Sequence, residues 1–261
     1  MSNDEQEYDE NLTTLLEAVW GEGFLSPGGV AEVDRYIEGI DFTDKQVLDI
    51  GCGLGGVDIH LIRQHKAKKI IGIDVDPYLI KRCNVLAKKY NVVANAEFLA
   101  VVPGPLAFGD ETFDIVTSKD SIIHIPDKHV LAADAFRILR AGGWVVASDW
   151  LAGYVTAPSP EMQVYLSAEG LDFGLATAEQ YRAALEAAGF VDIQLVDRND
   201  WYRQRARQER TQMRESLYDD LLSTVGKSFL EHEIDVWDKM IIALDQGQLR
   251  PTHFRGRKPS Q

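Results

Sequence analysis

Short hydrophobic runs alternate with amphipathic stretches along most of the chain. In the stretch at 128–140, Leu131, Ala135 and Ile138 recur at helical spacing on one face, and Gly142 and Gly143 follow. Strands that alternate with such helices indicate an α/β fold with a doubly wound, mainly parallel sheet. The runs that predict strands, each bounded by turn-forming residues, are 47–50, 70–73, 95–100, 113–117, 144–149 and 190–197, and 253–258 is a candidate final strand.

Three segments fall outside this alternation. Residues 1–29 precede it and are predicted to form an N-terminal cap. Residues 151–175 have no clean period and are long for a connection, which is typical of a lid or binding loop. Residues 201–248 read as inserted helices. We therefore expect one large domain over residues 30–261 that carries the lid and the helical insertion.

Composition and charge exclude several classes of function. A net charge of −14 argues against nucleic-acid binding, and the interrupted basic cluster at 203–210 is expected to be one solvated helix face. Two cysteines make no disulfide framework, the polar N-terminus shows no secretory signal, and no apolar stretch is long enough to cross a bilayer. The histidines show no ligand spacing, so no metal is expected. We expect a cytoplasmic protein without nucleic-acid or membrane partners, as a monomer or homodimer.

A glycine-rich turn follows the first predicted strand. Gly51, Gly53 and Gly56 have the G-x-G-x-x-G spacing, which lets the backbone turn tightly and approach a nucleotide-type cofactor. Asp49 would repel a pyrophosphate but would attract the ammonium and sulfonium of S-adenosylmethionine (SAM). Asp74 ends the next strand about 20 residues on, where an acid can accept both ribose hydroxyls. These features predict SAM as the cofactor.

Taken together, these motifs resemble those of class I SAM-dependent methyltransferases, which have a Rossmann-like fold. The resemblance covers residues 45–195 and includes Phe-Asp-Ile-Val at 113–116. Ser-Lys-Asp-Ser-Ile-Ile-His at 118–124 is similar to the S-[RQ]-D-x-x-x-H segment of phosphoethanolamine N-methyltransferases and of sarcosine/dimethylglycine N-methyltransferases. The run from 8 to 29 looks like the cap of the phosphoethanolamine enzymes, and 249–258 also matches in pattern.

This resemblance implies roles for individual residues. Tyr8 and His124 would pair to latch the cap and help to deprotonate an amine. Independently of the resemblance, Asp120 lies one turn from His124 if that segment is helical, and from there it could orient the substrate or the imidazole. Aromatic rings in the loop and lid segments, which also include Phe173, would bind the substrate by cation–π attraction. The substrate residues predicted are Trp20, Phe24, Trp150, Tyr165 and Glu169. The cofactor residues predicted are Asp49, Gly51, Gly53, Gly56, Asp74, Val75, Leu25, Ser26, Val102, Ser118 and Lys119.

The chain departs from the phosphoethanolamine enzymes at three places. Val102 stands where the family usually offers an acid to the adenine amino group. Glu169 and Asp172 occupy the part of the lid where the family has a basic phosphate-binding residue. The family's phosphate-binding lysine aligns near Lys239 or Met240. Because an acidic lid repels phosphate, we expect a small amine without a phosphate, free or carrying a carboxylate or apolar group.

Methyl transfer to the nitrogen of a small polar amine is therefore the expected function. Three alternatives within the enzyme class stay open: methylation at oxygen, methylation at sulfur, and phosphoethanolamine methylation itself. A cofactor-binding protein without catalysis is disfavoured because Gly51, Gly53, Asp49 and Asp74 are intact. A nicotinamide dehydrogenase is disfavoured by Asp49.

Overall fold

The computed structural model describes residues 8–170 and 173–260, and this part of the chain contains one seven-stranded sheet with the order β3-β2-β1-β4-β5-β7-β6. β7 alone runs antiparallel to its neighbours, β5 and β6. The predicted doubly wound, mainly parallel sheet is confirmed. The strands are β1 (Gln46–Ile50), β2 (Lys69–Asp74), β3 (Ala96–Ala100), β4 (Phe113–Lys119), β5 (Leu139–Ala152), β6 (Val191–Asp197) and β7 (Leu249–Arg257).

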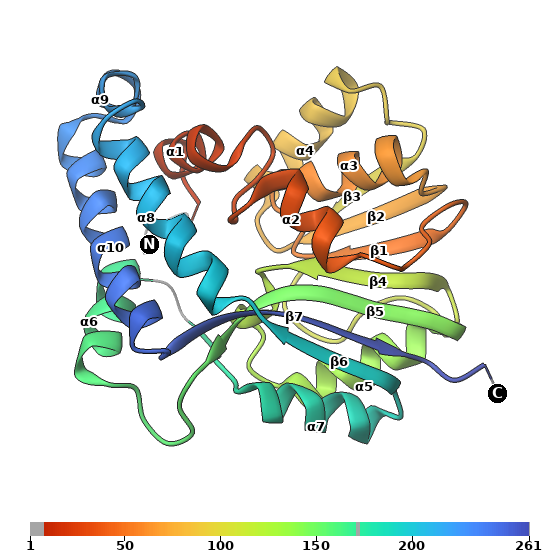
Figure 1. Cartoon of the computed structure of the whole chain (residues 1–261). Helices are drawn as coiled ribbons and strands as arrows, with labels where there is room; N and C mark the ends of the chain where they lie inside the picture. Colours follow the sequence, from red (N-terminus) through yellow and green to blue (C-terminus); the bar gives the residue numbers. More distant parts are fainter. Residues whose placement is uncertain (1–7, 171–172, 261) are drawn as a thin grey trace, which may run out of the picture.

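Helices cover both faces of this sheet (Figure 1). α2 (Gly29–Tyr36), α3 (Gly56–His65) and α4 (Pro77–Lys89) lie on one face, and α5 (Lys128–Ile138) and α7 (Ala178–Ala188) lie on the other. Successive strand side chains point to opposite faces, so Val47 packs in the core under α2 and α3 while Leu48 packs in the core under α5 and α7. This double burial explains why the parallel strands read as nearly continuous apolar runs.

The remaining five α-helices gather beyond one end of the sheet (Figure 1). Apolar side chains from all five pack into a single hydrophobic cluster. The predicted cap, lid and insertion thus contribute to one body, which we call the helical layer. Residues 1–7 of the cap and 171–172 of the lid lie outside the described residues. The helices are α1 (Glu10–Trp20), α6 (Pro160–Glu169), α8 (Asn199–Arg214), α9 (Tyr218–Val225) and α10 (Lys227–Asp245).

The cap is anchored to the sheet body as well as to the helical layer. Leu15 and Leu16 of α1 are buried in the helical-layer cluster. Glu17 accepts a hydrogen bond from the Gly23 amide at 2.8 Å and pairs with Arg82 of α4 at 2.8 Å. The loop that follows α1 is therefore held over the amino end of α3, close to the glycine turn.

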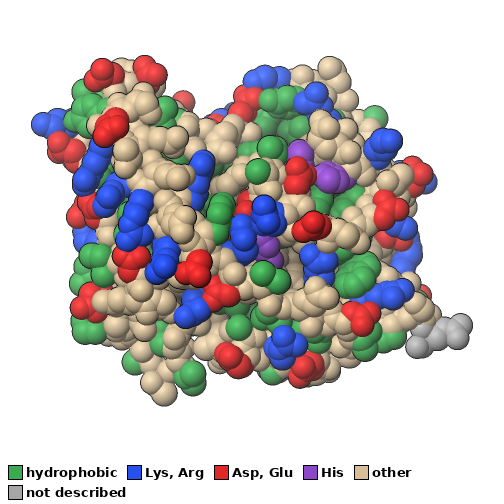
Figure 2. All heavy atoms as spheres, in the orientation of Figure 1, with side chains coloured by type: hydrophobic (Ala, Val, Ile, Leu, Met, Phe, Trp, Pro, Cys, Tyr) green, Lys and Arg blue, Asp and Glu red, His purple; other side chains and the backbone are tan. Residues whose placement is uncertain are grey.

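The basic cluster at 203–210 forms a half-buried face of α8, where basic side chains gather in Figure 2. Its arginines pair with acids of the helical layer: Arg205 with Glu209 at 3.1 Å and Arg210 with Asp238 at 2.6 Å. These arginines are half-buried and ion-paired, so the face is partly rather than fully solvated. Within the described part of the chain, none of the helices combines the length and apolar character needed to cross a bilayer.

Candidate active site

The glycine turn between β1 and α3 brings backbone to the edge of a large cavity. Gly51 has φ 71°, and a Cβ added to it would lie 1.7 Å from Ser121 Oγ. Its amide donates to the carbonyl of Ile73 at 2.8 Å, which fixes the turn to β2. Only glycine fits this close approach without strain. The cavity beside the turn has a volume of about 470 Å³, and we call it the larger cavity.

Apolar side chains and carboxylates line the larger cavity. Asp74, at the carboxyl end of β2, accepts hydrogen bonds from the amides of Gly53 and Asp76, both at 3.0 Å. Burial raises the pKa of Asp74 above its usual value in spite of these bonds. Among the described lining residues, Lys119 is the only Lys or Arg. The apolar part of the wall includes Val75, Leu79, Val101, Val102 and Leu106.

The Lys119 ammonium group is hydrogen-bonded to other groups of the protein. Its Nζ donates to Ser26 Oγ at 2.7 Å, to the carbonyl of Pro27 at 2.9 Å and to Asp120 at 2.8 Å. It therefore ties the cap loop to the carboxyl end of β4. Asp120 has a left-handed backbone, φ 57°, and its other carboxylate oxygen accepts from Ser148 Oγ at 2.8 Å. Two partners fix the Asp120 carboxylate at the cavity wall.

A second cavity, of about 80 Å³, lies between the sheet end and the helical layer. We call it the chamber. It shares five lining residues with the larger cavity, which we call the junction: Tyr8, Leu25, Ser26, Asp120 and His124. Beyond the junction, the chamber is lined mainly by aromatic rings, two carboxylates and aliphatic or methionine side chains. These include Trp20, Trp150, Tyr165, Glu169, Phe173, Tyr202, Glu233, Trp237 and Met240.

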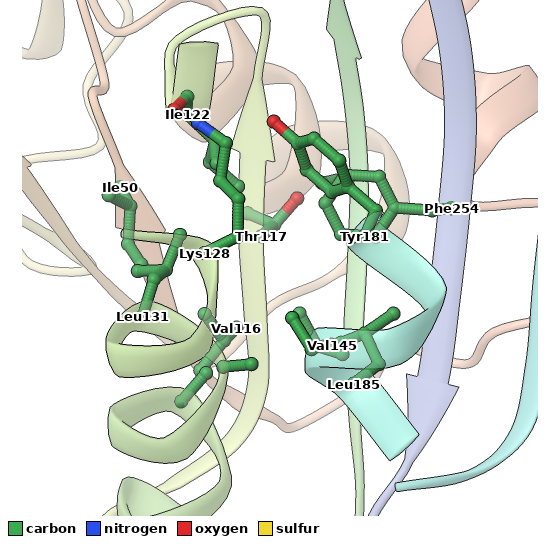
Figure 3. A pocket seen from close by; sticks show the side chains of 14 residues that line it. Ile50, Val116, Thr117, Ile122, Lys128, Leu131, Val145, Tyr181, Leu185 and Phe254 are labelled. Carbon is green, nitrogen blue, oxygen red and sulfur yellow. Dashed lines mark hydrogen bonds between the residues drawn. The ribbon is translucent and has the colours of Figure 1, made fainter. Parts of the chain in front are cut away.

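His124 ends a short 3-10 helix, η1 (Ile122–His124), and its ring lies 5.5 Å from that of Phe173. A buried polar network holds η1 from below. Lys128 Nζ donates to the carbonyls of Ile122, at 2.8 Å, and Ile125. Figure 3 shows Lys128 extending from α5 toward Ile122, across a small apolar cavity from Tyr181. This places a fixed donor beneath the segment that presents His124.

Asp149 of β5 supports η1 from the other side. Its carboxylate accepts from the amide of Ile123 at 3.1 Å and from the hydroxyl of Tyr181. Burial raises the pKa of Asp149 to about 7, against the lowering effects of Tyr181 and Lys128. Burial also lowers the pKa of Lys128 to about 8. No sequence pattern indicated this network, because Lys128, Asp149 and Tyr181 lie on three separate elements.

The structure brings most of the predicted residues to these two cavities. The predicted catalytic residues Tyr8, Asp120 and His124 all lie at the junction. The predicted substrate residues Trp20, Trp150, Tyr165 and Glu169 line the chamber. Phe24 does not: it lines the larger cavity, because the loop after α1 packs over the glycine turn. Asp172, the second acid of the predicted lid, is outside the described residues.

Three predicted cofactor residues lie behind the wall of the larger cavity. The amide of Gly56 donates to the carbonyl of Gly23 at 3.0 Å, and Ser118 Oγ donates to the carbonyl of Ile50 at 2.6 Å. Both support the turn without lining the cavity. Asp49 is 1% exposed, and burial together with the charge of Asp58 raises its pKa well above the usual value. Its side chain faces Asp58, so the predicted direct attraction of a cationic cofactor does not follow from its position.

Sequence reasoning missed the chamber residues Tyr202, Glu233 and Trp237, and it named Met240 only as a possible position of the family's phosphate-binding lysine. Glu233, Trp237 and Met240 are spaced i, i+4 and i+7, which places them on one face of α10. The feature that could have identified this face in the sequence is Glu233, an acid within an otherwise apolar helical stripe. Tyr202 of α8 could not be recognised from the sequence, because a single aromatic residue in a helix is typical of ordinary core packing.

A cluster of possible metal ligands lies away from both cavities. The Nε2 atoms of His60 and His65 lie 2.6 and 2.7 Å from Asp34 Oδ1, and these three side chains bridge α2 and α3. Their spacing in the sequence did not reveal the cluster, because Asp34 comes from another helix. None of the three lines the larger cavity or the chamber.

Comparisons with known proteins agree with this architecture. A methyltransferase-domain family model matches residues 30–195. Over 258 residues the chain is 29% identical to a phosphoethanolamine N-methyltransferase of Triticum aestivum, covering 98% of this chain and 49% of that protein. It is 23% identical over 256 residues to the phosphoethanolamine N-methyltransferase of Plasmodium falciparum, covering 97% of this chain and 93% of that protein. The chain spans about half the length of the curated plant relatives it matches.

A solved structure is similar over nearly the whole chain. It is phosphoethanolamine N-methyltransferase 2 of Haemonchus contortus, in complex with phosphomonomethylethanolamine and S-adenosylhomocysteine. The TM-score is 0.90 at 22% identity, and the match covers 98% of this chain and 59% of that one. The family model spans more than half of the chain, and the sheet order and glycine turn are those of the fold. This chain therefore belongs to the methyltransferase-domain family.

Proposed function

We propose that this chain transfers a methyl group from SAM to the nitrogen of a small amine that lacks a phosphate. The observation that carries the proposal is the junction: Tyr8, Asp120 and His124 lie between a cavity of nucleoside size and an aromatic, acidic chamber. Groups at a junction of this kind can contact both a methyl donor and an acceptor.

The larger cavity fits SAM better than a dinucleotide. Its apolar wall suits an adenine ring, and the Asp74 carboxylate can accept hydrogen bonds from ribose hydroxyls. The charge of Lys119 is compensated by Asp120 at 2.8 Å, which leaves no free cation for a pyrophosphate among the described lining residues. When bound, SAM would supply an electrophilic methyl group on a sulfonium.

The junction residues have distinct tasks in this proposal. An aliphatic amine is mostly protonated at neutral pH, so its proton has to leave before the lone pair can attack. His124 can accept that proton directly or through water. Asp120, fixed by Lys119 and Ser148, can orient the ammonium toward His124. Positioning of this kind supplies much of the rate of a displacement reaction.

The charge of the chamber supports an acceptor without a phosphate. Among its described lining residues there is no Lys or Arg. Met240 lines the chamber, whereas the Nζ of Lys239 pairs with Asp235. Glu169 lines the chamber too. A phosphate there would face carboxylates without a cation to compensate it.

Phosphoethanolamine is the second candidate, and the relatives reported above favour it. Side-by-side steady-state kinetics on phosphoethanolamine and on phosphate-free amines, with product masses read for each, decide between the two. We expect kcat/KM to be higher for phosphate-free amines. Efficient turnover of phosphoethanolamine that Glu169→Gln leaves unaffected would contradict our assignment of the chamber.

A further inference from the structure

The end of the chamber away from the junction is built from the helical layer. Glu169 comes from the last turn of α6, and Glu233 comes from the second turn of α10. Both line the chamber, and neither lines the larger cavity. They are therefore separated from the junction, where a methyl group would be transferred, and lie where the far end of an acceptor would be.

Glu233 is a buried acid without a counter-charge. The residue is 9% exposed, and among the described residues its side chain has no hydrogen-bond or ion-pair partner. Its charged neighbours are the acids Glu169 and Asp9, which raise its pKa beyond the effect of burial, to about 7. A carboxylate held like this costs stability unless a ligand compensates it.

Glu169 is in a similar position. Glu169 is half-buried, and burial raises its pKa to about 7, against the lowering effect of the nearby Tyr165 hydroxyl. Among the described residues no Lys or Arg lines the chamber to compensate this carboxylate. The carboxylates of Glu169 and Glu233 thus form a pair without a compensating cation.

Aromatic rings surround this pair. Trp237 follows Glu233 by one helical turn, and its ring lies 5.6 Å from that of Trp20 of α1. Aromatic faces together with carboxylates make a site suited to an ammonium group, because both attract a cation and the rings replace part of its hydration shell. An anionic group would be repelled by the carboxylates, and a neutral group would lack the charge attraction that a cation gains here.

We propose that the acceptor carries a second cationic group, held by Glu169 and Glu233, at the end opposite the nitrogen that is methylated. The substrate class is then a small diamine or an amine with a distal alkylated ammonium. This inference rests on the proposed function, because it takes the junction as the place of methyl transfer. It adds that the chamber selects for positive charge as well as against phosphate.

The test compares acceptors of equal length and different distal charge. Diaminopropane, diaminobutane and diaminopentane are each matched with the amino alcohol and the amino carboxylate of the same chain length. We expect kcat/KM for the best diamine to exceed that of its amino alcohol by about tenfold to a hundredfold. The amino carboxylate should be poorer still. Equal values for a diamine and its amino alcohol would overturn the inference.

Variants assign the preference to the pair. Glu233→Gln keeps the shape of the side chain and removes its charge, so the ratio of diamine to amino alcohol should fall toward one. Glu231→Gln is the matched control, since Glu231 lies on the same helix, exposed, and pairs only with Lys227 at 3.6 Å among the described residues. It should leave the ratio unchanged. If Glu233→Gln lowered kcat/KM by the same factor for all acceptors, Glu233 would have a structural role instead. Thermal unfolding of each variant checks that it is folded.

A binding measurement separates this inference from the proposed function. Calorimetric titration of the protein with S-adenosylhomocysteine present measures diamine and amino-alcohol binding without turnover. Preferential diamine binding without any methylated product would support the cation site and refute the N-methyltransferase. Methylated amine products without preferential diamine binding would support the N-methyltransferase and refute the cation site.

Discussion

At the scale of single residues, Asp74 offers the sharpest test of the cofactor site. Asp74→Ala removes the charged acceptor at the end of β2. We expect affinity for S-adenosylhomocysteine to fall by about 1.5–3 kcal/mol, which is the cost of losing a hydrogen bond to a charged group. Calorimetric titration measures this loss. Glu97→Ala is the control, because Glu97 lies on the neighbouring strand and pairs with Lys69 at the surface; an equal loss in both variants would remove Asp74 from the site.

Lys128 is a positioning residue in our interpretation, since it contacts η1 and neither cavity of the active site. In Lys128→Met the carbonyls of Ile122 and Ile125 lose their donor, so the His124 segment should shift. We expect kcat to fall by about tenfold to a hundredfold, with affinity for S-adenosylhomocysteine within twofold of the original. The exposed Lys81→Met serves as control. A parallel loss of cofactor affinity and kcat would indicate general unfolding.

At the scale of elements, a buried ion network joins α2 to β7 and to Arg198, the N-cap residue of α8. Glu32, 5% exposed, accepts from Arg198 at 2.9 Å and from His253 at 2.7 Å. Glu32→Ala leaves Arg198 and His253 without their carboxylate, and we expect a loss of about 3–5 kcal/mol in unfolding free energy. Denaturant titration measures it. The exposed Arg203–Asp200 pair is the control, and Asp200→Ala should change stability by less than about 1 kcal/mol.

The strands of the sheet could be predicted because strands buried on both faces consist of nearly continuous apolar residues. The glycine turn could be predicted because the spacing of Gly51 and Gly53 serves a local backbone requirement. Tyr8 and His124 could be placed only by resemblance, since a single tyrosine or histidine has no pattern of its own. Glu233 and the Lys128–Asp149 network required coordinates, because their meaning depends on neighbours from distant segments.

At the scale of the whole molecule, buried carboxyl groups set how stability depends on pH. Asp149, Glu169 and Glu233 have pKa values raised to about 7 in the folded protein. The folded state therefore binds more protons than the unfolded state between about pH 4.5 and 7, so stability falls as pH rises through this window. Above about pH 7 all three carboxyl groups are ionised in the folded protein, and the free-energy cost of burying their charges is fully present.

We accordingly expect the protein without ligands to melt at a higher temperature at pH 6 than at pH 8. Each of the three carboxyls contributes about 1 kcal/mol to the difference. Scanning calorimetry at the two pH values measures it. The double variant Glu169→Gln and Glu233→Gln should reduce the difference, and an unchanged or inverted pH dependence would contradict the raised pKa values.

The two cavities draw their walls from different parts of the chain. Strand ends and the glycine turn supply most of the larger cavity, whereas the far end of the chamber comes from helices with a hydrophobic cluster of their own. Natural selection can therefore act on the two walls separately. Descendants of one ancestor can exchange acceptors through substitutions confined to α6 and α10, while the inherited methyl-donor machinery stays intact. Chains that share this sheet are thus free to diverge in what they methylate long before they diverge in how they do it.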